Sequence, residues 1–209
     1  MLKNATTSKL NLSKVIWFLT SSDIMVWGTA SIGAPLVAIY LTSKFGELTV
    51  QYIGVATAIY FVIRGLSQLP LGILTDKIKS DIDEITLLIA GSVLMGTPYL
   101  FYPLVSEPWH YYLIQAFIGL GASLNLNNWR KLFAKNLTKD REGQTYGFYE
   151  TIMSLSTALF GLLGGYISSI NAEIFEIVIM SLGVMIIVGG LINVGIYTVN
   201  NRKSAIVKV

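Results

Sequence analysis

Residues 51–77 read QYIGVATAIYFVIRGLSQLPLGILTDK, an apolar stretch with a single charge, Arg64, before it ends at Asp76 and Lys77. A helix needs about 20 predominantly apolar residues to cross the hydrocarbon core of a bilayer, and this stretch is long enough. The whole chain is 53% hydrophobic and only 13% charged, whereas a soluble domain is usually about 25% charged. Such a chain has too few polar groups to cover a water-exposed surface, so we expect the lipid bilayer to be its solvent.

Five further stretches have similar length and polarity, and short charged segments separate them. The predicted fold is therefore an all-α membrane protein, a six-transmembrane-helix bundle that occupies residues 15–199. The tails, residues 1–14 and 200–209, are expected to lie outside the membrane. The six expected spans are residues 15–41, 51–74, 85–104, 110–129, 145–168 and 174–199.

The basic residues indicate how the chain crosses the membrane. Of the 15 lysines and arginines, all except Lys44 and Arg64 fall in the two tails and in the loops after the second and fourth spans. Because basic loops stay on the cytoplasmic side, we expect a multi-pass protein of the cell membrane, plasma or inner, with cytoplasmic N- and C-termini. The same distribution accounts for the pI of about 9.0, so we expect no nucleic-acid binding.

Composition excludes several chemistries. The chain has no cysteine and one histidine, His110, so disulfides, iron–sulfur clusters, cysteine nucleophiles and His-rich metal sites cannot form. Neither H-E-x-x-H nor G-x-S-x-G occurs, the patterns of zinc metalloproteases and of many serine hydrolases. We therefore expect no enzyme activity, no metal and no cofactor.

Two charges fall inside expected spans, where a charge is costly and functional by default. Asp23 in span one and Arg64 in span two lie about 12 Å and 15 Å from the cytoplasmic ends of those spans, at 1.5 Å per residue. Because consecutive helices are usually neighbours, we predict an Asp23–Arg64 ion pair. The pair either locks the bundle or breaks and re-forms as substrate or a proton enters. It would leave the cavity close to neutral, which argues against strongly charged solutes.

Span four carries a polar stripe with a period of four residues. Each step advances the helical position by about 40°, so the stripe turns slowly and is expected to face protein or a water-filled cavity. Helix–helix hydrogen bonding and cavity lining remain alternatives for it. The stripe residues singled out are Gln115, Ser123 and Asn127, and the residues on spans one and two that could contact a small solute, or pack in the core, are Trp27, Tyr60 and Gln68.

Aromatic residues gather near the outer ends of spans three and four. Such clusters are typical of the belt at a membrane–water interface, and we assign these residues no chemistry. They are Tyr99, Tyr102, Trp109, Tyr111 and Tyr112.

Gly72-Ile-Leu-Thr-Asp76-Lys77 resembles the G-x-L-x-D-R/K motif of the major facilitator superfamily, which lies in the cytoplasmic loop between the second and third helices of a six-helix half. The stretch from Arg141 to Glu150, followed by the glycines of span five, is similar to that family's connection between helices four and five. The resemblance covers essentially the whole chain. It implies a secondary transporter and a cytoplasmic gate that contains Gly72, Asp76, Lys77, Arg141 and Glu150.

The chain departs from the family in several places, among them a residue of span four and the length of the chain. Gln115 stands where many proton-coupled members carry arginine, so the resemblance does not support proton coupling by that residue. Family members usually have twelve helices in two halves, each half built from inverted three-helix repeats, and 209 residues correspond to one half. The resemblance therefore implies a half-size transporter of a small-molecule substrate that works as a parallel homodimer or with a second six-helix half. The alternative is a non-transporting membrane scaffold, an assembly partner or a truncated remnant.

Overall fold

The computed structural model describes residues 12–77, 81–169 and 174–199, and within these ranges it contains helices and no strand. The two predicted tails fall largely outside the described residues. The elements are α1 (Lys14–Asp23), the π-helix η1 (Ile24–Gly28), α2 (Thr29–Phe45), the 3₁₀-helix η2 (Gly46–Leu48), α3 (Thr49–Lys77), α4 (Asp81–Gly96), the 3₁₀-helix η3 (Thr97–Leu104), α5 (Pro108–Lys135), α6 (Glu142–Ser168) and α7 (Phe175–Leu191).

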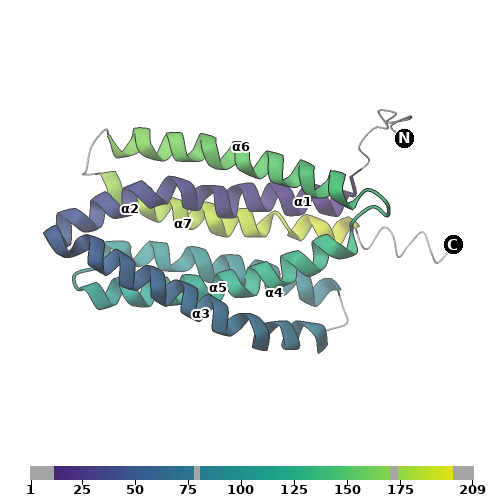
Figure 1. Ribbon diagram of the computed structural model, residues 1–209, viewed down its shortest axis with the longest axis horizontal. Coiled ribbons are helices and arrows are strands. Elements are labelled where there is room, and N and C mark those ends of the chain that lie inside the picture. The colour runs from purple at the N-terminus through teal and green to yellow at the C-terminus, as the bar shows by residue number, and fades with distance from the viewer. Residues whose placement is uncertain (1–11, 78–80, 170–173, 200–209) are drawn as a thin grey trace, which may run out of the picture.

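The elements join into long rods that run side by side and alternate in direction (Figure 1). One rod comprises α1, η1 and α2, another comprises α4 and η3, and α7 continues to Val199. Lys14, Lys77 and Lys135 lie at the same end of the bundle, here called the basic end. The turn at Gly46 and the start of α5 lie at the opposite end, called the far end.

Local chemistry explains where the rods begin, end and bend. Ser13 caps α1, because its Oγ accepts a hydrogen bond of 3.2 Å from the backbone N–H of Ile16. Gly46 ends α2 with a φ of 63°, a left-handed conformation that glycine adopts at low cost. Pro108 is the first residue of α5, and Nδ1 of His110 accepts a hydrogen bond of 3.3 Å from the backbone N–H of Glu107. The only histidine of the chain therefore helps to start a helix.

In the described residues, four helical segments are long and apolar enough to cross a membrane. They are Lys14–Lys77, Asp83–Leu104, Glu142–Ser168 and Phe175–Val199, and the first contains both the α1–α2 rod and α3. The helix α5 is not among them, since Asn125, Asn127 and Asn128 make its second half polar. By length and hydropathy alone, then, α5 crosses a membrane less readily than its neighbours.

The packing places α5 at the centre of one side of the bundle, where it contacts both α3 and α4. On the other side α2 packs against α6 and α7, and α7 also packs against α4. The helices α2 and α3 are joined at the far end but make few contacts along their length. Glycines permit the closest crossings, as at Gly119, where a Cβ atom would lie 2.6 Å from the carbonyl oxygen of Tyr60.

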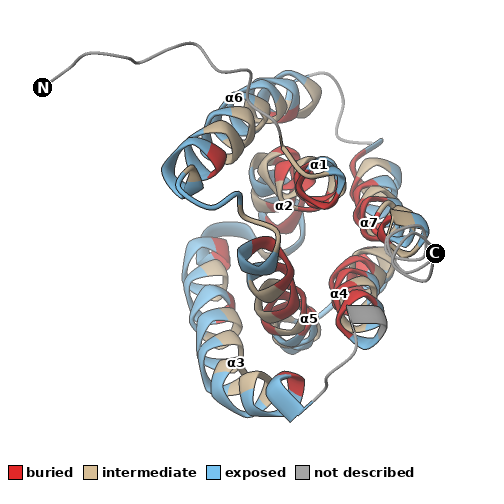
Figure 2. Ribbon diagram, turned by 90° about the vertical axis from the view of Figure 1, so that its right-hand side faces the viewer, coloured by how far each residue is buried: buried red, intermediate tan, exposed pale blue. Residues whose placement is uncertain are grey.

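The helices α3 and α6 are the least covered (Figure 2). Both are pale blue over most of their length, and both lie on one side of the bundle, with α2 and α5 between them. Large apolar side chains cover much of the outer surface of each, as expected of helices that face lipid or another protein. The exposed large residues are Val50, Val55, Phe61, Val62, Leu66, Leu69, Ile73 and Leu74 on α3, and Tyr146, Leu155, Leu159, Leu162, Leu163 and Tyr166 on α6.

Candidate functional site

Asp23 does not pair with Arg64, so the predicted ion pair is wrong. The carboxylate of Asp23 is 2% exposed and lies at the last residue of α1, beside the π-helical segment. The hydroxyl of Tyr149 on α6 donates a hydrogen bond of 2.7 Å to its Oδ2 atom. Its Oδ1 atom is buried and has no partner among the described residues. The buried acid of span one is therefore held by a phenol from α6.

Helix arrangement explains why the pair does not form. The prediction assumed that consecutive helices are neighbours, but α1 packs beside α6 and α5, and α3 diverges from it toward the basic end. Depth also differs, because 1.5 Å per residue places Arg64 about 20 Å from the basic end of α3 and Asp23 about 14 Å from that of α1. Arg64 is thus level with Trp27, about one helical turn farther in than Asp23.

Arg64 lies among aromatic rings. Its guanidinium donates a hydrogen bond of 3.2 Å to the hydroxyl of Tyr60. The guanidinium carbon lies 5.9 Å from the ring centre of Trp27, 5.8 Å from that of Tyr60 and 5.9 Å from that of Phe61. These distances are within the range of cation–π attraction. No ion pair joins Arg64 to a carboxylate in the part of the chain that the structure describes.

A cavity of about 160 Å³ lies beside the aromatic neighbours of Arg64. Residues of the α1–α2 rod, α3, the α4–η3 rod, α5 and α7 line it, and Arg64 itself is not among them. Trp27 and Tyr60, which flank Arg64, form part of its wall, and Gln115 contributes an amide. A second cavity of about 250 Å³ lies farther toward the far end and shares Ala30, Tyr99 and Gln115 with the first. The rest of the first cavity's wall is formed by Ala30, Met95, Tyr99, Ile118 and Ile186.

Part of the predicted aromatic belt turns inward. Tyr102 and Tyr111 are buried, and Tyr99, Tyr102 and Tyr111 all line the second cavity. Tyr111 also accepts a hydrogen bond of 3.3 Å from the amide of Gln115. The prediction that these three residues form only an interfacial belt is therefore wrong. Trp109, by contrast, is exposed near the start of α5.

In the polar stripe of α5, one residue lines the cavities and another forms a hydrogen bond between helices, the two roles considered for the stripe. Gln115 lines both cavities. Ser123 is fully buried, and its hydroxyl has no partner among the described residues. Asn127 donates a hydrogen bond of 2.9 Å to the backbone carbonyl of Gln68 on α3, so it joins two helices. Only the Gln115 end of the stripe faces a cavity.

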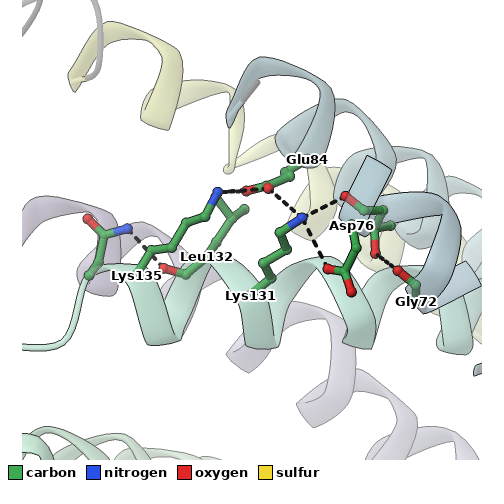
Figure 3. Close-up of polar contacts among 8 residues, drawn as sticks. Gly72, Asp76, Glu84, Lys131, Leu132 and Lys135 are labelled. Carbon is green, nitrogen blue, oxygen red and sulfur yellow. Dashed lines mark hydrogen bonds and ion pairs between the residues drawn. The ribbon is translucent and has the colours of Figure 1, made fainter. Parts of the chain in front are cut away.

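A charge cluster lies at the basic end, where α3, α4 and α5 meet (Figure 3). Glu84 is fully buried between two lysines of α5, with its carboxylate 3.0 Å from Nζ of Lys131 and 2.8 Å from Nζ of Lys135. Lys131 also pairs with Asp76 at 3.5 Å and donates a hydrogen bond of 2.6 Å to the carbonyl of Thr75. We refer to Asp76, Glu84, Lys131 and Lys135 as the inner charge cluster.

Of the predicted gate residues, only Asp76 belongs to the inner charge cluster. Gly72 accepts a hydrogen bond of 2.9 Å from the hydroxyl of Thr75, one turn later in α3. Arg141 precedes α6, and its carbonyl accepts hydrogen bonds of 3.1 Å from both the backbone N–H and the hydroxyl of Thr145. Lys77 and Glu150 are exposed.

Sequence reasoning missed Glu84, Lys131 and Lys135, although a signal was present. A carboxylate near the start of one helix and two lysines four residues apart near the end of the next face the same end of an antiparallel pair. Lysines at that spacing share a helix face, and α4 and α5 are such a pair. The cavity tyrosines gave no comparable signal, because periodicity does not tell a lipid-facing aromatic from an inward one.

Long apolar helices packed in alternating directions, with cavities between them, define an all-helical, multi-pass membrane protein. The family profile of the Major Facilitator Superfamily matches residues 16–208, nearly the whole chain. The chain therefore belongs to the Major Facilitator Superfamily, whose members are transporters and not enzymes. Its length of 209 residues is consistent with a half-size form. No curated protein and no solved structure matches it.

Proposed function

We propose that this protein is a half-size transporter of a small solute that works by alternating access, either as a parallel homodimer or with a second six-helix half. The observation that carries the proposal is the position of the cavity residues. Trp27, Tyr60 and Gln115 line the wall of one cavity and come from the α1–α2 rod, α3 and α5. In Figure 2, α2 and α5 lie between α3 and α6, the two helices with the most uncovered surface in the described structure. A second half seated across those helices would close the wall into a central chamber.

The glycines of α3 and α6 support this arrangement. A Cβ atom added at any of seven glycines on these helices would meet no other atom within 4 Å. By contrast, a Cβ atom added at Gly119 on α5, or at Gly164 on the buried face of α6, would lie 2.6 Å from a backbone carbonyl oxygen of a neighbouring helix. Small residues allow helix backbones to approach closely in membranes, so bare ones mark faces able to receive another helix. The seven are Gly54, Gly65, Gly72, Gly143, Gly147, Gly161 and Gly165.

The pattern of crossings supports a bundle of two inverted three-helix repeats. If α1–α2 corresponds to α5, α3 to α6 and α4–η3 to α7, the observed neighbours map onto one another: α3 packs on α5 as α6 packs on α2, and α4 packs on α5 as α7 packs on α2. The pair α4 and α7 maps onto itself, and there the contact is reciprocal. A Cβ at Gly96 would lie 2.5 Å from the Gly183 carbonyl, and one at Gly183 would lie 2.6 Å from the Gly96 carbonyl.

The predicted orientation extends the proposal to the ends of the bundle. The basic end would face the cytoplasm of a plasma or inner membrane, since basic loops are retained there. Asp76 is 80% exposed despite its pairing with Lys131, so it keeps a free side. In a parallel dimer that side would approach the N-terminus of the partner's α6, where a helix dipole favours an anion. The inner charge cluster would then contribute to a cytoplasmic gate.

Cysteine cross-linking tests the pairing directly, because the chain contains no cysteine. Gly54 lies 5 residues from the far end of α3 and Gly161 lies 7 residues from the far end of α6, so the two are nearly level. Membranes carrying Gly54→Cys and Gly161→Cys together should form a disulfide-linked dimer on mild oxidation. Val184→Cys, on an exposed face of α7, is the matched control and should remain monomeric.

Solute flux tests the function. Purified protein in liposomes should take up solutes from a panel, with a rate that rises with the square of protein density if two copies form the unit. Absence of flux and of cross-linking would leave a scaffold or a truncated remnant as the function. Flux from a strictly monomeric protein would contradict the pairing and retain the transporter.

A further inference from the structure

We propose that the cavity beside Arg64 binds a small organic anion with a flat apolar body, such as an aromatic monocarboxylate. This inference rests on the proposed function, since it names the substrate class of the same cavity. It replaces the expectation of a neutral cavity. That expectation required Asp23 to neutralise Arg64, whereas Asp23 accepts its hydrogen bond from Tyr149.

The first argument is the unused capacity of Arg64. A guanidinium carries five N–H donors in a planar fork that matches a carboxylate. The structure gives Arg64 one hydrogen bond, to the hydroxyl of Tyr60. The rings of Trp27, Tyr60 and Phe61 stabilise its charge. They do not supply the oxygen acceptors that its N–H groups need for hydrogen bonds. Arg64 lies near the middle of a long apolar helix, where a charge is costly, and an anion is the ligand that would satisfy its remaining donors.

The second argument is the lining of the cavity. Trp27 presents a buried indole N–H that has no partner among the described residues, and an indole can only donate. The cavity wall contains aromatic and aliphatic residues and one amide, Gln115, but no carboxylate. A free donor and a cation beside a wall without acidic groups select for an acceptor-rich, negatively charged ligand. A cationic ligand would be repelled by Arg64.

The third argument is the shape of the cavity. Its volume is about 160 Å³, and the side chains of Trp27, Tyr60 and Tyr99 provide flat walls. Aromatic rings pack well in offset or edge-to-face arrangements against such walls. Met95, Ile118 and Ile186 make the remaining surface apolar. The ligand expected is therefore a single-ring or similarly compact acid, with the carboxylate directed to Arg64 and Trp27.

Equilibrium binding of radiolabelled benzoate, benzamide and benzylammonium to the full-length protein in nanodiscs tests the proposal without requiring transport. The three probes share one ring and differ in charge. Benzoate should bind most tightly, and benzylammonium should bind most weakly. Equal affinity for the three, or preference for benzylammonium, would overturn the proposal.

Variants identify the residues responsible. Arg64→Gln should weaken benzoate binding by about tenfold to a hundredfold, the range for losing one charged hydrogen-bond donor, and should leave benzamide binding unchanged. Arg130→Gln, an exposed arginine near the basic end of α5, is the matched control and should bind benzoate normally. If Arg64→Gln does not fold, Trp27→Phe removes only the N–H donor and should weaken benzoate binding several-fold. Benzoate binding that is insensitive to both positions would contradict the site.

The outcome is separable from that of the proposed function. Flux of neutral solutes that is unaffected by Arg64→Gln would retain a transporter and refute the anion site. Benzoate binding that depends on Arg64, in a protein that catalyses no flux of any solute, would retain the site and refute transport.

Discussion

The hydroxyl of Tyr149 and the carboxylate of Asp23 form a hydrogen bond of 2.7 Å between residues 126 positions apart in the chain. This bond ties α6 to the rod of α1, η1 and α2 at the point where the rod changes from α-helix to π-helix. Local π-helical turns occur frequently at functional sites. Here the π-helical segment η1 begins directly after the buried Asp23 and contains Trp27.

Tyr149→Phe should destabilise the protein, because it leaves the buried Asp23 with no hydrogen-bond donor among the described residues. The expected cost is about 1.5–3 kcal/mol, the range for hydrogen bonds to charged groups, measured as thermal unfolding in detergent micelles. Tyr146→Phe is the control on the same helix, since Tyr146 is 44% exposed and no hydrogen bond involves its hydroxyl in the described structure. Equal losses in the two variants would contradict a specific role for the Asp23–Tyr149 bond.

Glu84→Gln should be among the most destabilising single substitutions at the basic end. It removes the charge between Lys131 and Lys135 and leaves their ammonium groups partly uncompensated. Breaking a buried pair by removing one partner costs roughly 3–5 kcal/mol. Asp83→Asn alters an exposed carboxylate one residue earlier and should cost little. Unfolding curves of the two variants that coincide would rule out the inner charge cluster as a source of stability.

Gly119→Val should separate α3 from α5. The new side chain would begin 2.6 Å from the carbonyl oxygen of Tyr60, and overpacking of this kind costs about 1–3 kcal/mol. Because Tyr60 also lines the cavity, ligand binding should weaken with stability. In Gly65→Ala the added methyl group meets nothing, and stability should stay the same or rise by about 0.5–1 kcal/mol. The prediction fails if the valine variant melts at the temperature of the unaltered protein.

Gly161→Leu should weaken association between copies without affecting the fold of one copy. Its side chain would enter space that is open in the described structure and would fill the face that we assign to a second half. Native mass spectrometry from detergent should show a shift from dimer toward monomer, with an unchanged melting temperature. Val184→Leu on α7 should leave the dimer intact. A dimer that persists in Gly161→Leu would move the interface elsewhere.

Hydropathy indicates where long helical segments lie, because an apolar run long enough to cross a bilayer leaves few alternatives, but α5 is not among the segments apolar enough to cross a membrane in the described residues. The wrong ion pair shows where such reasoning ends. Asp23 and Arg64 have opposite charge and depths that the sequence makes similar, but a shift of one helical turn and the lateral packing of the helices, which the one-dimensional pattern does not contain, keep them apart. Neighbours in sequence, α2 and α3, diverge, whereas α6 reaches Asp23 from far along the chain.

The candidate site was predictable only in part, because the sequence indicates the depth of a residue along its helix but not which neighbour it faces. Trp27, Tyr60 and Gln115 were singled out by depth and polarity, and they line one cavity. Tyr99 and Tyr111 were assigned to the membrane interface by their position near helix ends, yet they line the second cavity. Glu84 was overlooked because a carboxylate at a helix start is ordinarily a solvent-exposed residue, and only tertiary packing buries it between two lysines.

The bare glycines of α3 and α6 also determine what surrounding lipid must do. At a glycine on the surface of an unpaired helix, lipid acyl chains have to fill the space that a side chain would occupy. This ordering lowers the conformational entropy of the acyl chains. Between helices in a bilayer there is no hydrophobic driving force, so close contact and the release of ordered lipid favour association. Self-association of this protein should therefore respond to acyl-chain length and unsaturation, and hardly at all to ionic strength.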